Sequence, residues 1–234
     1  MPICRGGTPL PPVSGNKAGS KDGRPRSAAP TVDTTISVSS AANPVWYSSR
    51  MSYDFRLCLP QAGRSREETA TADEEDLRIT DPVRAKEERK QRVSAALIGR
   101  NPALEPFAFA FDELSKLENI TVEDAKKKYR HIELNGPTEE SNGIQITLFD
   151  DEASVTVPYW HQGAAARRVF EEIWSYLEII EREGGFFTYD PQVERVLDLR
   201  KDFEASLSCY DGVSREIADH FSVQQKKPWW QFWN

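Results

Sequence analysis

Apolar and polar side chains alternate strictly over residues 52–59, directly after Met51. A period of two places successive side chains on opposite faces of an extended chain, so this pattern predicts a half-buried β-strand. Apolar residues recur with the same period over residues 129–135, 143–149 and 154–160, which predicts three further strands. A short, mostly polar connection of residues 150–153 separates the last two strands, and these strands are therefore expected to form a hairpin.

A helical period replaces this alternation over residues 163–183. Apolar residues three or four positions apart form one stripe, and charged residues that include Glu172 and Glu181 are expected to form the solvent-facing side. Gly184 and Gly185 should end the helix. Further helices are predicted from an N-cap at Asp81 to about Ile98, over residues 112–118 and 121–128, and over residues 201–222 with Gly212 as a break.

Three remaining patterns complete the predicted elements. Val196, Leu197 and Leu199 predict either a last strand or the start of the next helix. Residues 186–189 form a short, mostly apolar stretch, which predicts a fifth strand. Residues 60–80 are polar and acidic, which predicts a loop. Pro158 has no amide hydrogen, so the strand over 154–160 is expected to lie at a sheet edge there.

These elements predict an α+β fold. We expect a single antiparallel or mixed sheet of four to five strands, packed by the long amphipathic helix 163–183, with additional helices. Strands and helices do not alternate regularly along the chain, which argues against a parallel α/β sheet.

The two ends of the chain differ in composition from its middle. Residues 1–50 are rich in Gly, Pro, Ser, Ala and Thr without apolar periodicity, and they are predicted to be a disordered extension. Residues 51–222 form the predicted α+β domain, and residues 223–234 form a Trp-rich tail. The pattern leaves open whether the protein starts at Met1 or Met51.

The tail concentrates aromatic side chains at a chain end, where polar residues are the norm. Three of the six Trp residues of the chain lie in its last six positions. Because Pro228 and the polar residues before it favour a hinge, we expect the tail to project and to bind a partner. The predicted binding residues are Lys226, Lys227, Trp229, Trp230, Phe232 and Trp233. The alternative is that these aromatic residues fold back and complete the core.

Charge and cysteine content narrow the class of protein. The net charge of −7 and the pI of about 5.2 argue against nucleic-acid binding. The three cysteines are far apart and do not predict a disulfide framework, and no apolar run approaches the roughly 20 residues that span a bilayer. A cytoplasmic location is therefore expected.

Candidate chemistry is sparse. His161 lies between a strand and the strongest helix, where it could act as a general base, although the acidic residues 150–152 lie at the far end of the same strand. The three histidines have no metal-ligand spacing, and no nucleotide-binding or hydrolase motif occurs. We therefore expect no catalytic residue, no metal and no cofactor.

Three stretches carry a family resemblance. Residues 51–54, Met-Ser-Tyr-Asp, resemble the first strand of many small bacterial proteins. Residues 143–160 and the later Tyr-Asp-Pro-Gln of residues 189–192 resemble small proteins found beside toxin genes and regarded as immunity factors. The tail is similar to C-termini rich in Lys-Pro-Trp-Trp on unrelated bacterial proteins. Together these stretches cover about half of the chain, contain no catalytic motif, and imply a bacterial origin and a non-enzymatic role.

The sequence therefore predicts a non-enzymatic protein-binding module. Its most concrete form is an immunity-type inhibitor whose acidic surface covers a basic toxin. The first alternative is a peripheral membrane protein anchored by the aromatic tail. The second is an enzyme of unknown reaction that uses His161.

Overall fold

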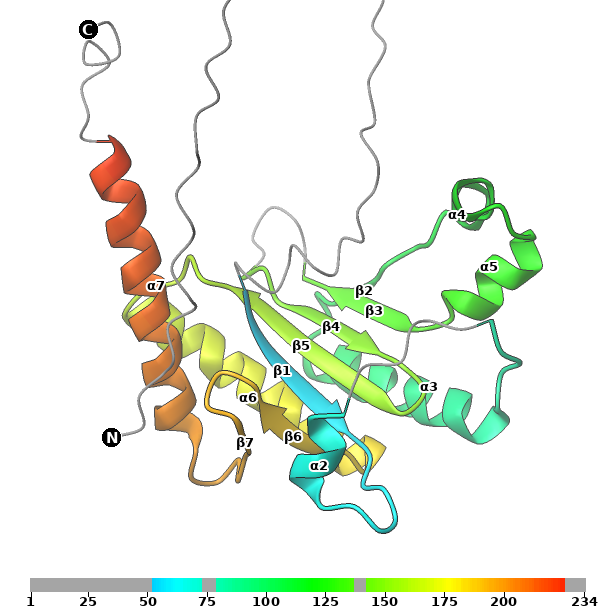
Figure 1. Cartoon of the computed structure of the whole chain (residues 1–234), viewed down its shortest axis with the longest axis horizontal. Coiled ribbons are helices and arrows are strands. Elements are labelled where there is room, and N and C mark those ends of the chain that lie inside the picture. The colour runs from blue at the N-terminus through cyan, green and yellow to red at the C-terminus, as the bar shows by residue number, and fades with distance from the viewer. Residues whose placement is uncertain (1–51, 73–78, 137–141, 226–234) are drawn as a thin grey trace, which may run out of the picture.

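Seven strands form one antiparallel sheet in the order β2-β3-β4-β5-β1-β6-β7 (Figure 1). The computed structural model describes residues 52–72, 79–136 and 142–225, with side chains up to residue 219. The strands are β1 (Ser52–Cys58), β2 (Glu105–Pro106), β3 (Ile132–Asn135), β4 (Gln145–Leu148), β5 (Glu152–Pro158), β6 (Phe187–Asp190) and β7 (Arg195–Val196). The helices of this part of the chain are α2 (Arg66–Ala70), α3 (Arg84–Arg100), α4 (Phe111–Glu118), α5 (Val122–Lys128), α6 (Ala164–Gly184) and α7 (Phe203–Gln225).

The predicted α+β class is confirmed, but the predicted strand number is too small. The sheet has seven strands where four to five were expected, and every pairing is antiparallel. The additional strands β2 and β7 have two residues each. Two residues cannot show a period of two, so sequence alternation could not reveal β2. β7 includes Val196, where the sequence left open a last strand.

Strand β1 lies inside the sheet, between β5 and β6. It pairs with β5 along its whole length, from Ser52 opposite Pro158 to Cys58 opposite Glu152. β5 is thus an interior strand, and the edge position expected from Pro158 is wrong for the strand as a whole. The ladder between β5 and β4 ends at Thr156, however, two residues before the proline.

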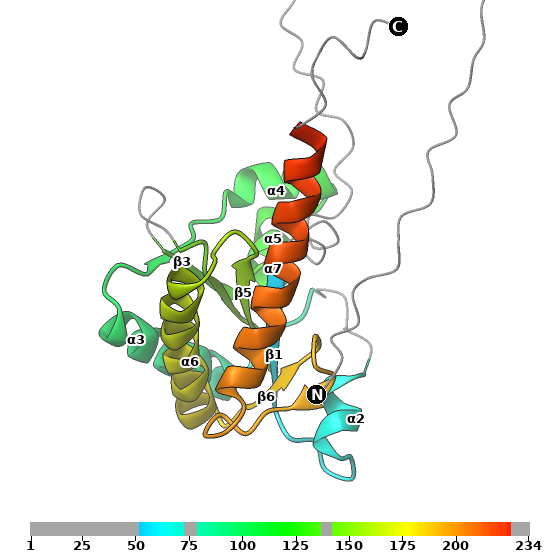
Figure 2. The same ribbon diagram turned by 90° about the vertical axis from the view of Figure 1, so that its left-hand side faces the viewer.

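One face of the sheet carries the hydrophobic core. Alternate residues of β1 and β5, such as Phe55 and Val155, are fully buried against α3, α6 and α7. Figure 2 shows α3 and α6 on one side of the sheet and the short helix α2 on the other. Helix α2 packs on this second face, around β6 and β7 at one end.

Helix α6 confirms the strongest sequence pattern. Its predicted stripe is buried, with Phe170, Ile173 and Leu177 each at 0% exposure, and it ends where Gly185 adopts a left-handed conformation with φ 76°. The expected solvent-facing side is only partly correct. Glu172 accepts hydrogen bonds from two asparagines outside the helix, and Glu181 accepts two from Thr188.

Three other elements differ from the prediction. The expected loop over residues 60–80 contains α2, which Ser65 and Glu68 start with a reciprocal capping box. Helix α3 starts at Arg84 rather than beside Asp81, whose carboxylate instead pairs with Lys127. Helix α7 runs through Gly212 without a break and continues to Gln225.

Candidate functional site

The binding residues predicted in the tail, Lys226, Lys227, Trp229, Trp230, Phe232 and Trp233, lie outside the described residues, as does the extension 1–50. Helix α7 leads toward the tail, and its last turns extend beyond the sheet in both views (Figures 1 and 2). The surfaces and buried groups that the structure describes belong to residues 52–72, 79–136 and 142–219.

His161 lies at the corner between β5 and α6, where it contacts α7. Its Nε2 is 2.6 Å from the carbonyl oxygen of Asn142 and 2.9 Å from the indole Nε1 of Trp160. Its backbone N–H donates to the Tyr210 hydroxyl, and the Ser214 hydroxyl donates to its carbonyl. No carboxylate of the described residues bonds the ring, so the base and orienting acid of a catalytic pair are not brought together. The hydrogen bonds of the His161 backbone with Tyr210 and Ser214 connect α7 to the end of β5.

Asp190 is the most deeply buried carboxylate in the structure, at 0% exposure. Its Oδ2 accepts hydrogen bonds from the hydroxyls of Tyr53 (2.6 Å) and Ser206 (2.7 Å), and its Oδ1 accepts from the backbone N–H of Gln192 (2.9 Å). Burial raises the pKa of Asp190, while these hydrogen bonds oppose the shift. The Tyr-Asp-Pro-Gln stretch thus has a structural role, because Asp190 joins β1, the turn after β6 and α7.

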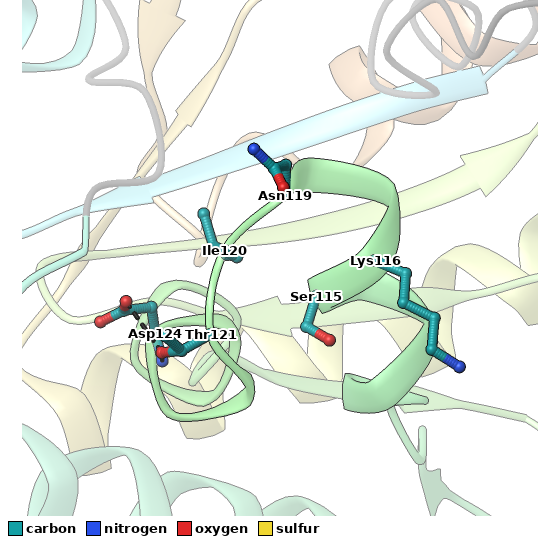
Figure 3. Close-up of a pocket in the computed structure, with 6 residues that line it drawn as sticks. All are labelled: Ser115, Lys116, Asn119, Ile120, Thr121 and Asp124. Carbon is teal, nitrogen blue, oxygen red and sulfur yellow. Dashed lines mark hydrogen bonds between the residues drawn. The ribbon is translucent and has the colours of Figure 1, made fainter.

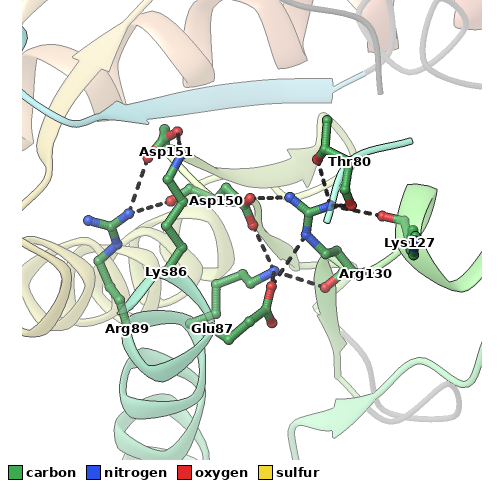
Figure 4. Close-up of polar contacts among 9 residues, drawn as sticks. Thr80, Lys86, Glu87, Arg89, Lys127, Arg130, Asp150 and Asp151 are labelled. Atoms are coloured by element: carbon green, nitrogen blue, oxygen red, sulfur yellow. Dashed lines mark hydrogen bonds and ion pairs between the residues drawn. The ribbon is translucent and has the colours of Figure 1, made fainter. Parts of the chain in front are cut away.

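A second polar cluster surrounds the turn between β4 and β5 (Figure 4). The ammonium of Lys90, whose side chain is 2% exposed, lies 2.9 Å from both Asp150 and Glu87 and donates to the carbonyl oxygen of Arg130. Arg130 also pairs with Asp150. Burial disfavours the ionised Asp150, but hydrogen bonds from Arg130 and Lys90 outweigh it and lower the pKa of this carboxyl. The cluster ties α3 and the start of β3 to the hairpin, which gives the acidic turn a structural role.

A depression between α4 and α5 is open to solvent (Figure 3). It is lined by Ser115, Lys116, Asn119, Ile120, Thr121 and Asp124. The Thr121 hydroxyl caps α5 by accepting from the Asp124 backbone N–H, and Asn119 is the left-handed C-cap of α4. These polar groups shape the helix ends, and no titratable pair in the depression has catalytic geometry.

Six rings form a continuous cluster beside β3, which we name the aromatic patch. Neighbouring ring centroids are 4.8–6.3 Å apart, the range of favourable aromatic contacts. The patch consists of Phe107, Phe109, Phe111, Tyr129, His131 and Phe149. Phe107 is 51% exposed, and none of the six belongs to the buried core.

Strand alternation places two rings of the aromatic patch, His131 and Phe149, on the face opposite the core. Leu134 in β3 and Leu148 in β4 point into the core, so His131 and Phe149, at odd offsets from them, point the other way. Burial, with a smaller effect of Lys90, lowers the pKa of His131 to about 4. His131 is therefore uncharged at neutral pH and behaves as one more aromatic ring. Phe107, Phe109 and Phe111 are alternate residues of one stretch of sequence. Tyr129, His131 and Phe149 lie farther along the chain, and the pairing of β3 with β4 brings the last two together.

Metal-ligand groups and membrane-spanning helices are both absent from the residues that the structure describes. No group of three or more His, Cys, Asp or Glu side chains there could hold a metal ion. No helix in the same residues combines the length and the apolar character needed to cross a bilayer.

Comparisons with known proteins identify no relative from which a function could be taken. The chain matches no protein-family model, no curated protein and no solved structure.

Proposed function

We propose that this chain is a non-enzymatic protein-binding module, in its most concrete form an immunity-type inhibitor that covers a basic protein. The observation that supports the proposal is the aromatic patch, a contiguous set of rings beside β3 that lies outside the buried core. Aromatic residues are enriched in protein interfaces and supply many of their strongest contacts.

The arrangement of polar groups also favours binding over catalysis. Asp190 and Lys90 are buried, and they and the partly buried Asp150 are each held by partners from other elements of the fold. His161 is held by the backbone and by Trp160. An acid or base that serves catalysis must face a substrate, whereas these groups bond to the protein itself.

The net charge of −7 supports a basic partner. An acidic chain and a basic partner attract each other, which speeds their association and favours this partner over others. An inhibitor benefits from such fast association with its target. The Trp-rich tail is proposed as a second contact with the same partner, which would raise the total affinity by linkage.

Co-purification tests this proposal. A tagged full-length chain is purified from its native cells, and proteins that co-elute at constant stoichiometry are identified by mass spectrometry. We expect one basic protein whose activity the pure chain inhibits when the two are mixed. A chain that elutes alone and sediments with lipid vesicles would instead support the membrane alternative.

A further inference from the structure

We infer that the aromatic patch, together with the acidic side chains around it, is the docking surface for an arginine- or lysine-rich segment of the partner. This inference rests on the proposed function and assigns it to one surface. The segment's aliphatic stems would cover the rings, and its cationic ends would reach the surrounding carboxylates.

Four carboxylates surround the rings. Glu105 lies two residues before Phe107 on the same extended stretch, so both side chains point to one face. Glu133 lies opposite Phe107, whose backbone N–H donates to the Glu133 carbonyl at 2.8 Å. Asp112 and Glu113 directly follow the ring of Phe111 in the first turn of α4 and are exposed.

These carboxylates are available to an external cation. Across the described residues, none of the four takes part in an ion pair within 4.0 Å. Glu133 accepts one neutral hydrogen bond, from Asn135. Most other acidic clusters of the fold differ in this respect, because Asp150, Asp151, Glu118 and Asp198 are all paired with cations.

The fold already contains one example of the proposed contact. The ammonium of Lys128 lies 2.6 Å from the carboxylate of Glu118 and 5.5 Å from the ring centroid of Tyr129, a member of the aromatic patch. A cation held between a carboxylate and an aromatic ring is therefore compatible with this surface. At the other end of the patch, Phe107 and Glu105 provide the same two groups without a cation from the described chain.

The neighbouring cations do not remove the negative potential there. Lys128 is paired with Glu118, and Arg130 is paired with Asp150 and Glu87. His131 is neutral because its pKa is lowered to about 4. Lys116 is exposed, one turn after Asp112, but it forms no ion pair with it. Of the charged groups around Phe107 and Phe111, the carboxylates therefore predominate.

The test uses the full chain and a peptide of nine arginines, with a peptide of nine glutamates as the opposite charge. Binding is measured by isothermal titration at about 0.15 M salt, where distant charges are screened over about 8 Å. Phe107→Ala should weaken binding about two- to fivefold, because one exposed cation–π contact is lost. Asp112→Asn/Glu113→Gln should weaken it about fivefold, because two exposed ion pairs are lost.

Matched controls separate the patch from general effects. Glu171→Gln/Glu178→Gln removes the same charge from the exposed side of α6, and Trp160→Ala removes an aromatic ring that is 66% exposed but lies outside the patch. Both controls should bind the arginine peptide within about twofold of the wild type, as expected for sites without a shared contact. Circular dichroism and thermal midpoints must show that every variant is folded.

The outcomes distinguish the surface from the function. Equal losses in the patch variants and in the α6 control would overturn the assignment of the surface while leaving a charge-driven binding module intact. If a stoichiometric partner co-purifies with the wild type but the arginine peptide does not bind, the basic chemistry of the segment is wrong. If the chain binds phosphatidylserine vesicles but no peptide, and the patch variants weaken this vesicle binding, the aromatic patch contacts lipid, and the proposal of a protein partner is wrong.

Discussion

The hydroxyl of Tyr53 donates a 2.6 Å hydrogen bond to the carboxylate of Asp190, 137 positions further along the chain. Tyr53 belongs to β1 and Asp190 ends β6, while the hydroxyl of Ser206 brings α7 to the same oxygen. Burying a carboxylate costs free energy unless hydrogen-bond donors surround it. The hydroxyls of Tyr53 and Ser206 therefore stabilise the packing of β1, β6 and α7 around Asp190.

Tyr53→Phe should lower the free energy of unfolding by about 1.5–3 kcal/mol, because a hydrogen bond to a charged, buried group is lost. Urea denaturation would measure the change. Tyr159→Phe is the control, since Tyr159 is also buried but no hydrogen bond of its hydroxyl occurs among the described residues. Equal losses in the two variants would mean that the Asp190 contact adds nothing.

The effect of Asp190→Asn should depend on pH. Burial raises the pKa of Asp190 above its ordinary value of 3.8. At a pH between 3.8 and the raised pKa, Asp190 therefore binds more protons in the folded protein than in the unfolded chain. Wild-type stability therefore gains, relative to the asparagine variant, as pH falls through the raised pKa. The loss caused by Asp190→Asn should be larger at mildly acidic pH than at neutral pH. Denaturation curves of both proteins over this range would check the sign.

Lys90→Met should destabilise the fold by about 3 kcal/mol, because it removes the cation from a buried pair and leaves Asp150 with fewer partners. The matched change Arg84→Met breaks a pair whose side chains are 92% and 59% exposed, and it should cost less than about 0.5 kcal/mol. Thermal unfolding of the two variants at neutral pH compares them directly. Similar midpoints would contradict a stabilising role for the Lys90 cluster.

Helix α6 allows a graded test of burial. Leu177→Ala should cost about 2–5 kcal/mol, because the side chain is fully buried, and the exposed Glu178→Ala should cost less than about 0.5 kcal/mol. Glu172→Ala should fall between them at about 1–3 kcal/mol, since it removes the carboxylate that accepts hydrogen bonds from Asn101, Asn142 and the Tyr176 hydroxyl. Guanidinium unfolding of the three variants gives the order. A neutral Glu172→Ala would restore the simple exposed-side interpretation.

Removal of residues 226–234 separates the roles of the tail. If the tail contacts a partner, the shortened chain should unfold at the same temperature as the full chain and bind its co-purifying protein more weakly by about 2 kcal/mol or more. If the aromatic residues complete the core, the midpoint should instead drop by several degrees. Calorimetry and a binding titration on one shortened protein give both answers.

Sequence reasoning predicted the elements whose signal is local and long. The stripe of α6 repeats over 21 residues, and β1 alternates over seven, so each contains several periods. β2 and β7 contain two residues each, and α2 is a five-residue helix marked only by its capping box. Elements of this length depend on the surfaces that they pack against, which one segment of sequence does not contain.

The site was harder to predict than the fold, for the same physical reason. Asp190 and Tyr53 both stood in recognisable motifs, but their relation depends on β6 pairing beside β1. The aromatic patch depends on β3 and β4 bringing His131 and Phe149 together. Contacts across strands follow from register, and register is a property of the assembled sheet.

The interior position of β1 has a consequence for how the protein folds and fails. β5 and β6 both pair with β1 and not with each other, so β1 alone joins the β2-β3-β4-β5 group to the β6-β7 pair. Its partner residues lie about a hundred positions or more along the chain, and such contacts of high sequence separation close slowly. Until β1 inserts, β5 and β6 each present an unpaired edge that can recruit another chain. Aggregation during refolding should therefore start at these two strands.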